Sequence, residues 1–277
     1  MEMRGMPVVN ALLEGYKERV LALKAKGVCP TLAVVRVGAR EDDLAYERGI
    51  LKRFSQAEAD VTVKELPEDV TQDELEGTLA SLNNDDKIHG ILLFRPLPKH
   101  LDEERARNLV CSKKDVDCMS DENFAHAFAM DGKGYPPCTP EAVIEILKHY
   151  NVEMKGKKAV VVGRSMVVGK PLAMLLLKEN ATVTICHTKT EKLEEECKNA
   201  DILCAAAGAA KMITKDFVKE GQVVMDVGIN MLDGQLCGDV DYESVSEIVE
   251  GITPVPGGVG SVTTTMLLKH TIMSAEA

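Results

Sequence analysis

Short apolar segments alternate with longer segments of helical periodicity along almost the whole chain. The apolar segments are continuous rather than alternating, which indicates strands covered on both faces, as in a parallel sheet flanked by helices. They span residues 31–37, 61–66, 90–93, 158–162, 182–186, 202–206 and 223–227. The order of strand, helix and strand predicts an α/β fold.

Helix start signals lie between these segments. Thr71 followed by Glu74 is a capping box, and Thr139 followed by Pro140 is a helix start with proline in the first turn. A proline-rich stretch at residues 135–138 precedes Thr139 directly. These signals predict a domain boundary near residue 139, with a cleft between two domains.

Length and composition agree with a globular protein of two domains. The chain has 277 residues, of which 45% are hydrophobic and 28% are charged. Its net charge of -11 would repel a phosphate backbone, and no basic run makes a local exception, so we expect no nucleic-acid partner. No window is apolar enough to be a membrane span or a signal core, which predicts a cytoplasmic protein without a membrane partner.

Cysteine and aspartate residues suggest neither disulfides nor a metal site. The eight cysteines include no C-x-x-C pair, so we expect reduced thiols. Asp115 and Asp117 resemble the start of a calcium loop. However, Cys118 and Met119 interrupt the alternation of ligands, and His126 stands where a bidentate Glu belongs. We therefore expect no metal.

A strand, a turn and a helix after residue 158 are typical of dinucleotide sites. The apolar residues 158–162 lead into Gly163, Arg164 and Ser165, and a leucine-rich helix follows. In this context backbone N–H groups and a helix N-terminus receive a pyrophosphate. Ser165 and Val168 replace the second and third glycines of the common G-x-G-x-x-G pattern. A purely structural turn is the alternative interpretation.

The end of the next strand bears on the choice of cofactor. NAD enzymes typically place an acidic residue there for the ribose diol, whereas residues 186–189 contain none. Arg164 and the Thr188 hydroxyl could bind a 2'-phosphate, which favours NADP and leaves NAD possible. Alternatively, Thr188 and Lys189 only solvate a loop.

Several motifs in the same order extend this pattern over nearly the whole chain. They are VGRS at 162–165, VGKP at 168–171, ATVTICH at 181–187, DVGIN at 226–230, GDV at 238–240 and TPVPGGVG at 253–260. Together they resemble the methylenetetrahydrofolate dehydrogenase/methenyltetrahydrofolate cyclohydrolase family. The resemblance implies a folate-binding catalytic domain at residues 1–139, completed by a C-terminal helix at 261–277. It also implies a Rossmann-like NAD(P)-binding domain at residues 140–260 and a homodimer.

The resemblance also implies binding residues. Those facing the dinucleotide are Gly163, Arg164, Ser165 and Ile229. Those helping to hold the folate are Pro256, Gly257, Gly258, Val259 and Gly260. A glycine-rich loop lets the backbone approach a flat ligand closely, although a tight turn before the last helix is the alternative.

The family's hydrolytic centre is only partly present. It combines a Tyr, a Lys four residues later on a helix, a Gln after a strand, and an Asp in a K-D-V-D segment. Tyr46 and Asp117 occupy two of these positions, but Ile50 stands at the Lys position and Phe94 at the Gln position. Tyr46 could stack on the pterin, and Asp117 could accept hydrogen bonds from its amino and ring N–H groups.

The two reactions of the family differ in what they need. Oxidation of the methylene carbon needs mainly alignment of folate against the nicotinamide ring. Hydrolysis needs a group that takes a proton from water, typically worth a factor of about 100 to 10,000, and Ile50 cannot supply it. We therefore expect oxidation of 5,10-methylenetetrahydrofolate with loss of cyclohydrolase activity. One alternative is a bifunctional enzyme in which Arg95 serves a rearranged hydrolytic centre, and another is a non-catalytic folate or nucleotide sensor.

Overall fold

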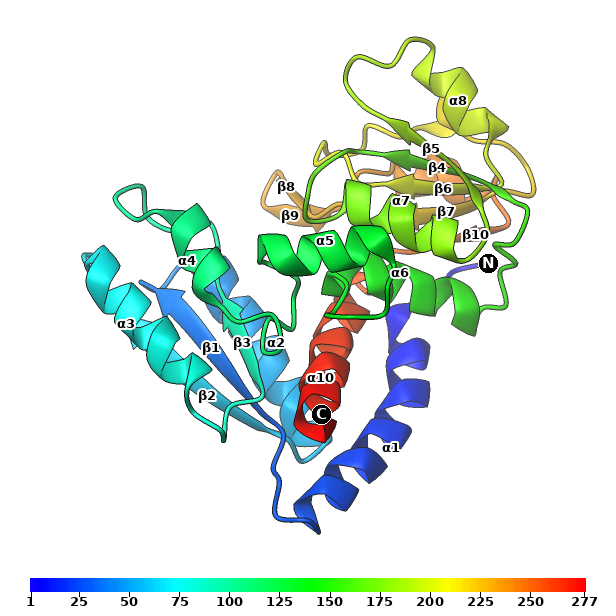
Figure 1. Cartoon of the computed structure of the whole chain (residues 1–277). Helices are drawn as coiled ribbons and strands as arrows, with labels where there is room; N and C mark the ends of the chain where they lie inside the picture. Colours follow the sequence, from blue (N-terminus) through cyan, green and yellow to red (C-terminus); the bar gives the residue numbers. More distant parts are fainter. The chain divides into compact units, whose positions relative to one another are not determined.

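The computed structural model describes residues 1–277, which divide into two compact units (Figure 1). The three-stranded unit comprises residues 11–138 and 264–277, and the five-stranded unit comprises residues 1–10 and 139–263. Two long helices, α1 (Gly5–Lys24) and α10 (Gly260–Glu276), contribute residues to both units. None of the helices has the length and apolar character needed to cross a membrane.

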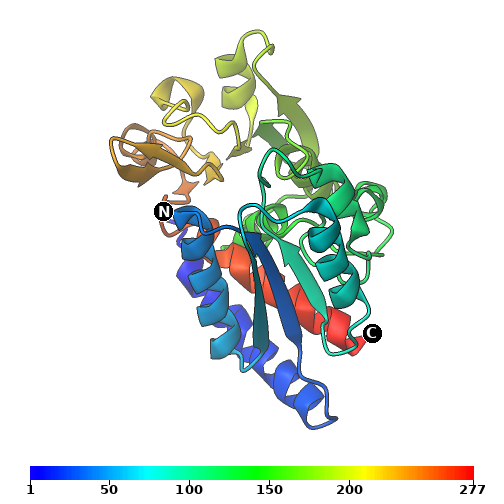
Figure 2. The same ribbon diagram turned by 90° about the vertical axis from the view of Figure 1, so that its left-hand side faces the viewer.

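A parallel sheet of order β2-β1-β3 forms the core of the three-stranded unit. Its strands are β1 (Thr31–Val37), β2 (Asp60–Leu66) and β3 (Gly90–Leu93), and its helices are α2 (Glu41–Gln56), α3 (Gln72–Asn83), α4 (Glu103–Leu109) and α5 (Asp121–Ala129). Successive crossovers run in opposite directions along the sheet, so right-handed connections place α2 and α3 on opposite faces, as Figure 2 shows. The central strand β1 is buried along nearly its whole length, whereas β2 is an edge strand.

A parallel sheet of order β10-β7-β6-β4-β5 forms the core of the five-stranded unit. Its strands are β4 (Lys158–Val162), β5 (Thr182–Cys186), β6 (Ile202–Ala205), β7 (Val223–Asp226) and β10 (Gly251–Ile252). Its helical elements are α6 (Cys138–His149), α7 (Gly169–Lys178), α8 (Leu193–Asn199), the 3₁₀ turn η1 (Lys215–Phe217) and α9 (Tyr242–Ser246). A small antiparallel hairpin of β8 (Asn230–Leu232) and β9 (Gln235–Cys237) lies between β7 and α9 in the chain.

The strand order defines where this unit binds ligands. The first strand, β4, pairs with β5 on one side and with β6 on the other. The chain therefore reverses its direction of travel between β4 and β6. Open α/β sheets bind ligands at such a switch point, beyond the carboxyl ends of the strands.

Candidate active site

Tyr46 and Phe94 meet in the three-stranded unit. Tyr46 lies on α2, and Phe94 follows β3 directly. Their ring centroids are 5.6 Å apart, and the planes are tilted by 35°. The side chain at the family's Gln position is therefore a buried ring that packs against the tyrosine.

Ile50 lies one helical turn after Tyr46, as the spacing on α2 predicts. Its side chain is fully buried, at 0% exposure. A hydrocarbon at this position makes no hydrogen bond, so neither of the two replaced positions offers an amine or an amide.

Asp117 is held by the loop that contains it. The neighbouring carboxylate of Asp115 accepts the backbone N–H groups of Met119 and Ser120 at 2.8–3.0 Å, and Cys118 adopts a left-handed conformation with φ of 55°. Asp117 itself accepts the backbone N–H of Cys138 at 3.2 Å. The tight loop therefore fixes the direction of the Asp117 carboxylate.

The negative charge of Asp117 acts on Tyr46, so the structure brings these two predicted residues together. Burial, and then the negative charge of Asp117, raise the pKa of Tyr46 well above its usual value. The phenol therefore stays protonated near neutral pH and can donate a hydrogen bond. Burial also raises the pKa of Asp117, while its hydrogen bonds from Cys138 and the positive charge of Arg95 act in the opposite direction.

Two residues beside this centre were not predicted from the sequence. The Cys138 thiol donates to the carbonyl of Val116 at 3.3 Å, and His270 Nδ1 lies 2.7 Å from the same carbonyl. The ring of His270 also stacks on Tyr135 at 5.1 Å. The proline-rich stretch before residue 139 signals a turn here, but no sequence pattern links it to the last helix.

The predicted dinucleotide turn occupies the carboxyl end of β4. Gly163 has φ of +136°, and a Cβ atom there would collide with the carbonyl oxygen of Ala206, so only glycine fits. The Ser165 hydroxyl accepts the backbone N–H groups of Val168 and Gly169 at 3.1 and 3.3 Å. Serine therefore holds the turn at the N-terminus of α7.

Arg164 and Thr188 follow neighbouring strands and are both exposed. Val162 pairs with Cys186 in the register of β4 and β5, which places the two loops beside each other. His187 has a structural role, because its Nδ1 accepts the backbone N–H of Lys189 at 3.1 Å.

Ile229 and the glycine-rich loop share one cavity of about 190 Å³ in the five-stranded unit. Residues 254–261 form one wall, and the segment after β7 forms another. Gly257 has φ of +104° within this loop. The structure thus brings the predicted cofactor residue Ile229 together with the predicted folate loop.

Two family models cover most of the chain. The catalytic domain of tetrahydrofolate dehydrogenase/cyclohydrolase matches residues 3–117, and the NAD(P)-binding domain of the same family matches residues 137–277. The chain belongs to the tetrahydrofolate dehydrogenase/cyclohydrolase family. The predicted family and the predicted two-domain α/β fold are thereby confirmed.

Similar proteins of this family come from diverse organisms. The chain is 55% identical over 275 residues to the bifunctional protein FolD of Alkaliphilus oremlandii, covering 99% of this chain and 96% of that protein. It is 54% identical to the bifunctional protein FolD of Carboxydothermus hydrogenoformans, covering 98% and 96%. The structure of the bifunctional enzyme FolD from Campylobacter jejuni superposes with a TM-score of 0.97 at 40% identity, covering 100% and 98%.

A further solved relative was crystallised with a cofactor. The methylenetetrahydrofolate dehydrogenase-cyclohydrolase (FolD) of Trypanosoma brucei, complexed with NADP cofactor and inhibitor, superposes with a TM-score of 0.94. It is 34% identical to this chain, and the match covers 100% of this chain and 97% of that one. These relatives favour the bifunctional alternative over the expected loss of cyclohydrolase activity.

Proposed function

We propose that this member of the tetrahydrofolate dehydrogenase/cyclohydrolase family oxidises 5,10-methylenetetrahydrofolate to 5,10-methenyltetrahydrofolate with NADP. The observation that carries the proposal is the turn after β4. There Gly163 allows the tight turn that packs against Ala206, and Ser165 holds the N-terminus of α7, at the switch point of the parallel sheet. Both features suit a pyrophosphate.

The choice of NADP rests on charge. Arg164 and Thr188 are exposed beyond neighbouring strands, and residues 186–189 carry no carboxylate that would repel a 2'-phosphate. A relative solved in complex with NADP supports the same choice. When bound, NADP accepts the hydride.

The protein's own residues contribute alignment rather than proton transfer to the oxidation. The lone pair of the neighbouring folate nitrogen drives the hydride from the methylene carbon, so the step needs no general base. Tyr46 offers a ring face and a protonated hydroxyl, and Asp117 offers an acceptor for the pterin N–H groups. The loop at residues 256–260 adds backbone that can approach the folate closely.

We infer that the protein also hydrolyses the methenyl cation. The name of the Campylobacter jejuni relative, a methylenetetrahydrofolate dehydrogenase/cyclohydrolase, supports this inference. Ile50 and Phe94 take no part in proton transfer, so the hydrolytic centre is rearranged. Arg95 is the positively charged group that acts on Asp117 in this region. Burial raises the pKa of Asp117, and the positive charge of Arg95 acts in the opposite direction by stabilising the anion.

Loss of the cyclohydrolase is the second candidate, and one observation favours it. Two hydrocarbon side chains, Ile50 and Phe94, are buried where the family places an amine and an amide. Without an amine or an amide to assist the attack of water, the methenyl product would leave the enzyme unhydrolysed.

One assay of both half-reactions separates these functions. Purified protein is given methylenetetrahydrofolate with NADP or NAD, and in a second reaction it is given the methenyl cation alone. We expect NADP-dependent oxidation together with hydrolysis well above the rate in buffer. Hydrolysis at the buffer rate would leave a monofunctional dehydrogenase, and absence of any turnover would leave the sensor hypothesis.

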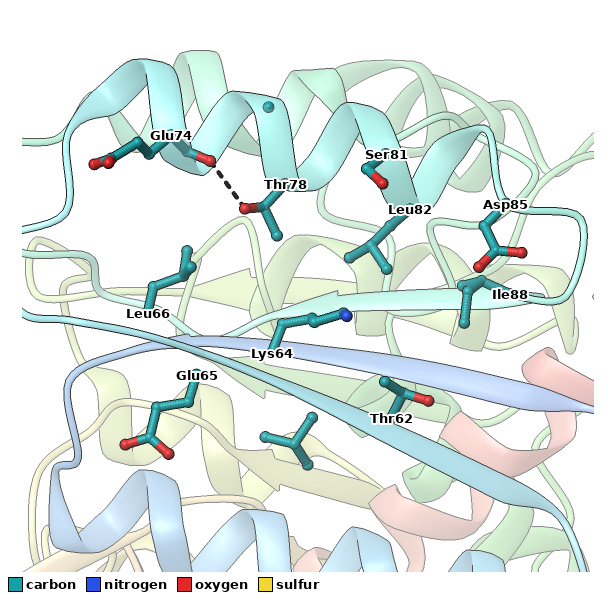
Figure 3. Close-up of a pocket in the computed structure, with 12 residues that line it drawn as sticks. Thr62, Lys64, Glu65, Leu66, Glu74, Thr78, Ser81, Leu82, Asp85 and Ile88 are labelled. Atoms are coloured by element: carbon teal, nitrogen blue, oxygen red, sulfur yellow. Dashed lines mark hydrogen bonds between the residues drawn. The ribbon is translucent and has the colours of Figure 1, made fainter.

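We further propose a homodimer that forms through the edge strand β2. Lys64 and Leu66 extend from β2 toward α3, beside a groove of about 710 Å³ between these two elements (Figure 3). The outer edge of β2 pairs with no other strand. Antiparallel pairing with a second copy about Thr62 would place Asp60 opposite Lys64 on both sides of the axis.

The cytoplasmic location stays a prediction.

A further inference from the structure

Two buried aspartates lie at the carboxyl end of the five-stranded sheet. Asp226 ends β7, and Asp239 follows the hairpin of β8 and β9. Their exposures are 3% and 0%. Buried carboxylates are rare unless several donors satisfy them, so their partners show what they organise.

Asp239 holds the loop that follows β6. Its carboxylate accepts three successive backbone N–H groups, from Ala207 at 2.6 Å, Gly208 at 2.9 Å and Ala209 at 2.9 Å. It also accepts the side-chain amide of Asn230 at 2.9 Å. One charged group thus ties the loop after β6 to the segment after β7.

Asp226 in turn fixes the position of Asp239. Its carboxylate accepts the backbone N–H of Asp239 at 2.9 Å, that of Val240 at 3.0 Å and that of Gly228 at 3.1 Å. A Cβ atom on Gly228 would collide with the Asp239 carboxylate, and one on Gly238 would collide with Asp226. The two glycines leave the space that the two carboxylates occupy.

The loop held by Asp239 borders the switch point. Its first residue, Ala206, carries the carbonyl oxygen that fills the space beside Gly163, so this loop packs directly on the dinucleotide turn. β6 and β4 are the two strands that flank the switch point. Asn230, the other partner of Asp239, adjoins Ile229.

We propose that Asp239 is a positioning residue for the dinucleotide: its carboxylate fixes the loop at residues 206–209 and Asn230 in the arrangement that receives the cofactor. The inference rests on the proposed function, because it assigns a role within the same site. Asp239 itself is enclosed by backbone donors and acts through the two segments that it holds.

The test uses Asp239→Asn in the full chain. Asparagine keeps the shape of the side chain, but it replaces one acceptor oxygen with a donor facing the backbone N–H groups. Titration of NADP by calorimetry, without folate, should show a Kd raised on the order of 10- to 100-fold, the range for hydrogen bonds to a charged group. At saturating NADP, kcat and the KM for folate should stay within about twofold.

The matched control is Asp241→Asn, two residues away, whose carboxylate makes no capping hydrogen bond to α9. It should leave the Kd unchanged. A folded Asp239→Asn variant with the native Kd would overturn the inference. So would a variant in which kcat and both KM values change together with thermal stability, because that pattern indicates a merely structural role.

A second variant tests the role of Asp239 if Asp239→Asn does not fold. Asn230→Ala removes one neutral donor and should raise the Kd of NADP by roughly 2- to 10-fold. An unchanged Kd would overturn the inference. If the native protein binds neither NADP nor NAD, the proposed function itself fails. If the native protein binds NADP and the variants bind it equally well, only the role of Asp239 fails.

Discussion

Arg95 is the residue on which the hydrolytic half of the proposed function depends. It follows Phe94 directly, and its charge acts on Asp117. Arg95→Ala should lower the rate of methenyl cation hydrolysis by about 10- to 100-fold, because Asp117 loses the cation that stabilises its charged form. Oxidation should fall by less than about threefold.

The measurement is the rate at which Arg95→Ala hydrolyses supplied methenyl cation. The control is the same rate in Lys99→Ala, which removes an exposed lysine four residues later in the chain. Hydrolysis that persists unchanged in Arg95→Ala would remove Arg95 from the centre. An equal loss of both activities would indicate that Arg95 binds the folate.

Arg164 decides between the two dinucleotides. Arg164→Ala should raise the KM for NADP by about 10- to 100-fold and leave the KM for NAD nearly unchanged, because only NADP carries the 2'-phosphate. Steady-state kinetics with both cofactors measure this, and Lys178→Ala at the far end of α7 is the control. If both KM values rise equally, Arg164 contacts the pyrophosphate instead.

Asp226 gives stability a specific dependence on pH. Burial raises the pKa of Asp226 to about 7, although hydrogen bonds from Val240 and Asp239 act against this rise. Between the ordinary pKa of about 4 and this value, the folded state holds a proton that the unfolded state has released. The free energy of unfolding should therefore decrease as pH rises through this window, by up to about 1.4 kcal/mol per pH unit from this group.

The test is denaturant unfolding at pH values from roughly 4.5 to 7.5, which cover this window. The free energy of unfolding should change less steeply with pH in Asp226→Asn, because asparagine does not titrate. Charged groups lining the adjacent cavity are Lys211, Asp233, Asp241 and Glu243, and the nearest carboxylate is Asp239. Asp241→Asn should keep the native slope. Identical slopes in native protein and Asp226→Asn would show that Asp226 is ionised throughout.

At the level of secondary structure, hydrophobic patterning was informative for the buried strands of four or more residues, whereas the buried two-residue strand β10 was not predicted. All seven predicted strands exist, with ends that differ by at most one residue. The capping box of Thr71 and Glu74 is present with both of its hydrogen bonds. The hairpin of β8 and β9 was missed because its short strands are largely exposed and carry no buried pattern.

Only part of the candidate site could be predicted from the sequence. The spacing of Tyr46 and Ile50 on a helix could be predicted, because it depends only on local geometry. The buried pair of Asp226 and Asp239 could not. Its partners come from loops far apart in the sequence, and the need for glycine at position 238 is visible only once the carboxylates are placed.

At the scale of the whole molecule, the first residues belong with the five-stranded unit rather than with the segment that follows them. The N–H of Met3 donates to the carbonyl of Ile252, and that of Gly5 donates to the carbonyl of Gly257, both at 2.8 Å. These long-range bonds have no local signal in the sequence. The functional domain boundaries near residue 139 stay a prediction.

The assembly of two copies is testable by charge exchange on β2. Asp60 and Lys64 are both exposed, and antiparallel pairing about Thr62 sets each against the other. Lys64→Asp should weaken the dimer by roughly 1 to 4 kcal/mol, because two symmetric pairs change from attraction to repulsion. Sedimentation equilibrium should then show a dimer Kd raised at least about fivefold.

The double variant Asp60→Lys, Lys64→Asp restores opposite charges across the axis and should recover most of the dimer. Recovery would require that residues 60 and 64 face each other across the axis, because a change at residue 60 compensates for the loss of Lys64 only if the two side chains interact. Lys99→Asp, an exposed charge change in the same unit, controls for net charge. If the double variant dissociates as far as Lys64→Asp alone, or if the native chain is monomeric, β2 is not the interface.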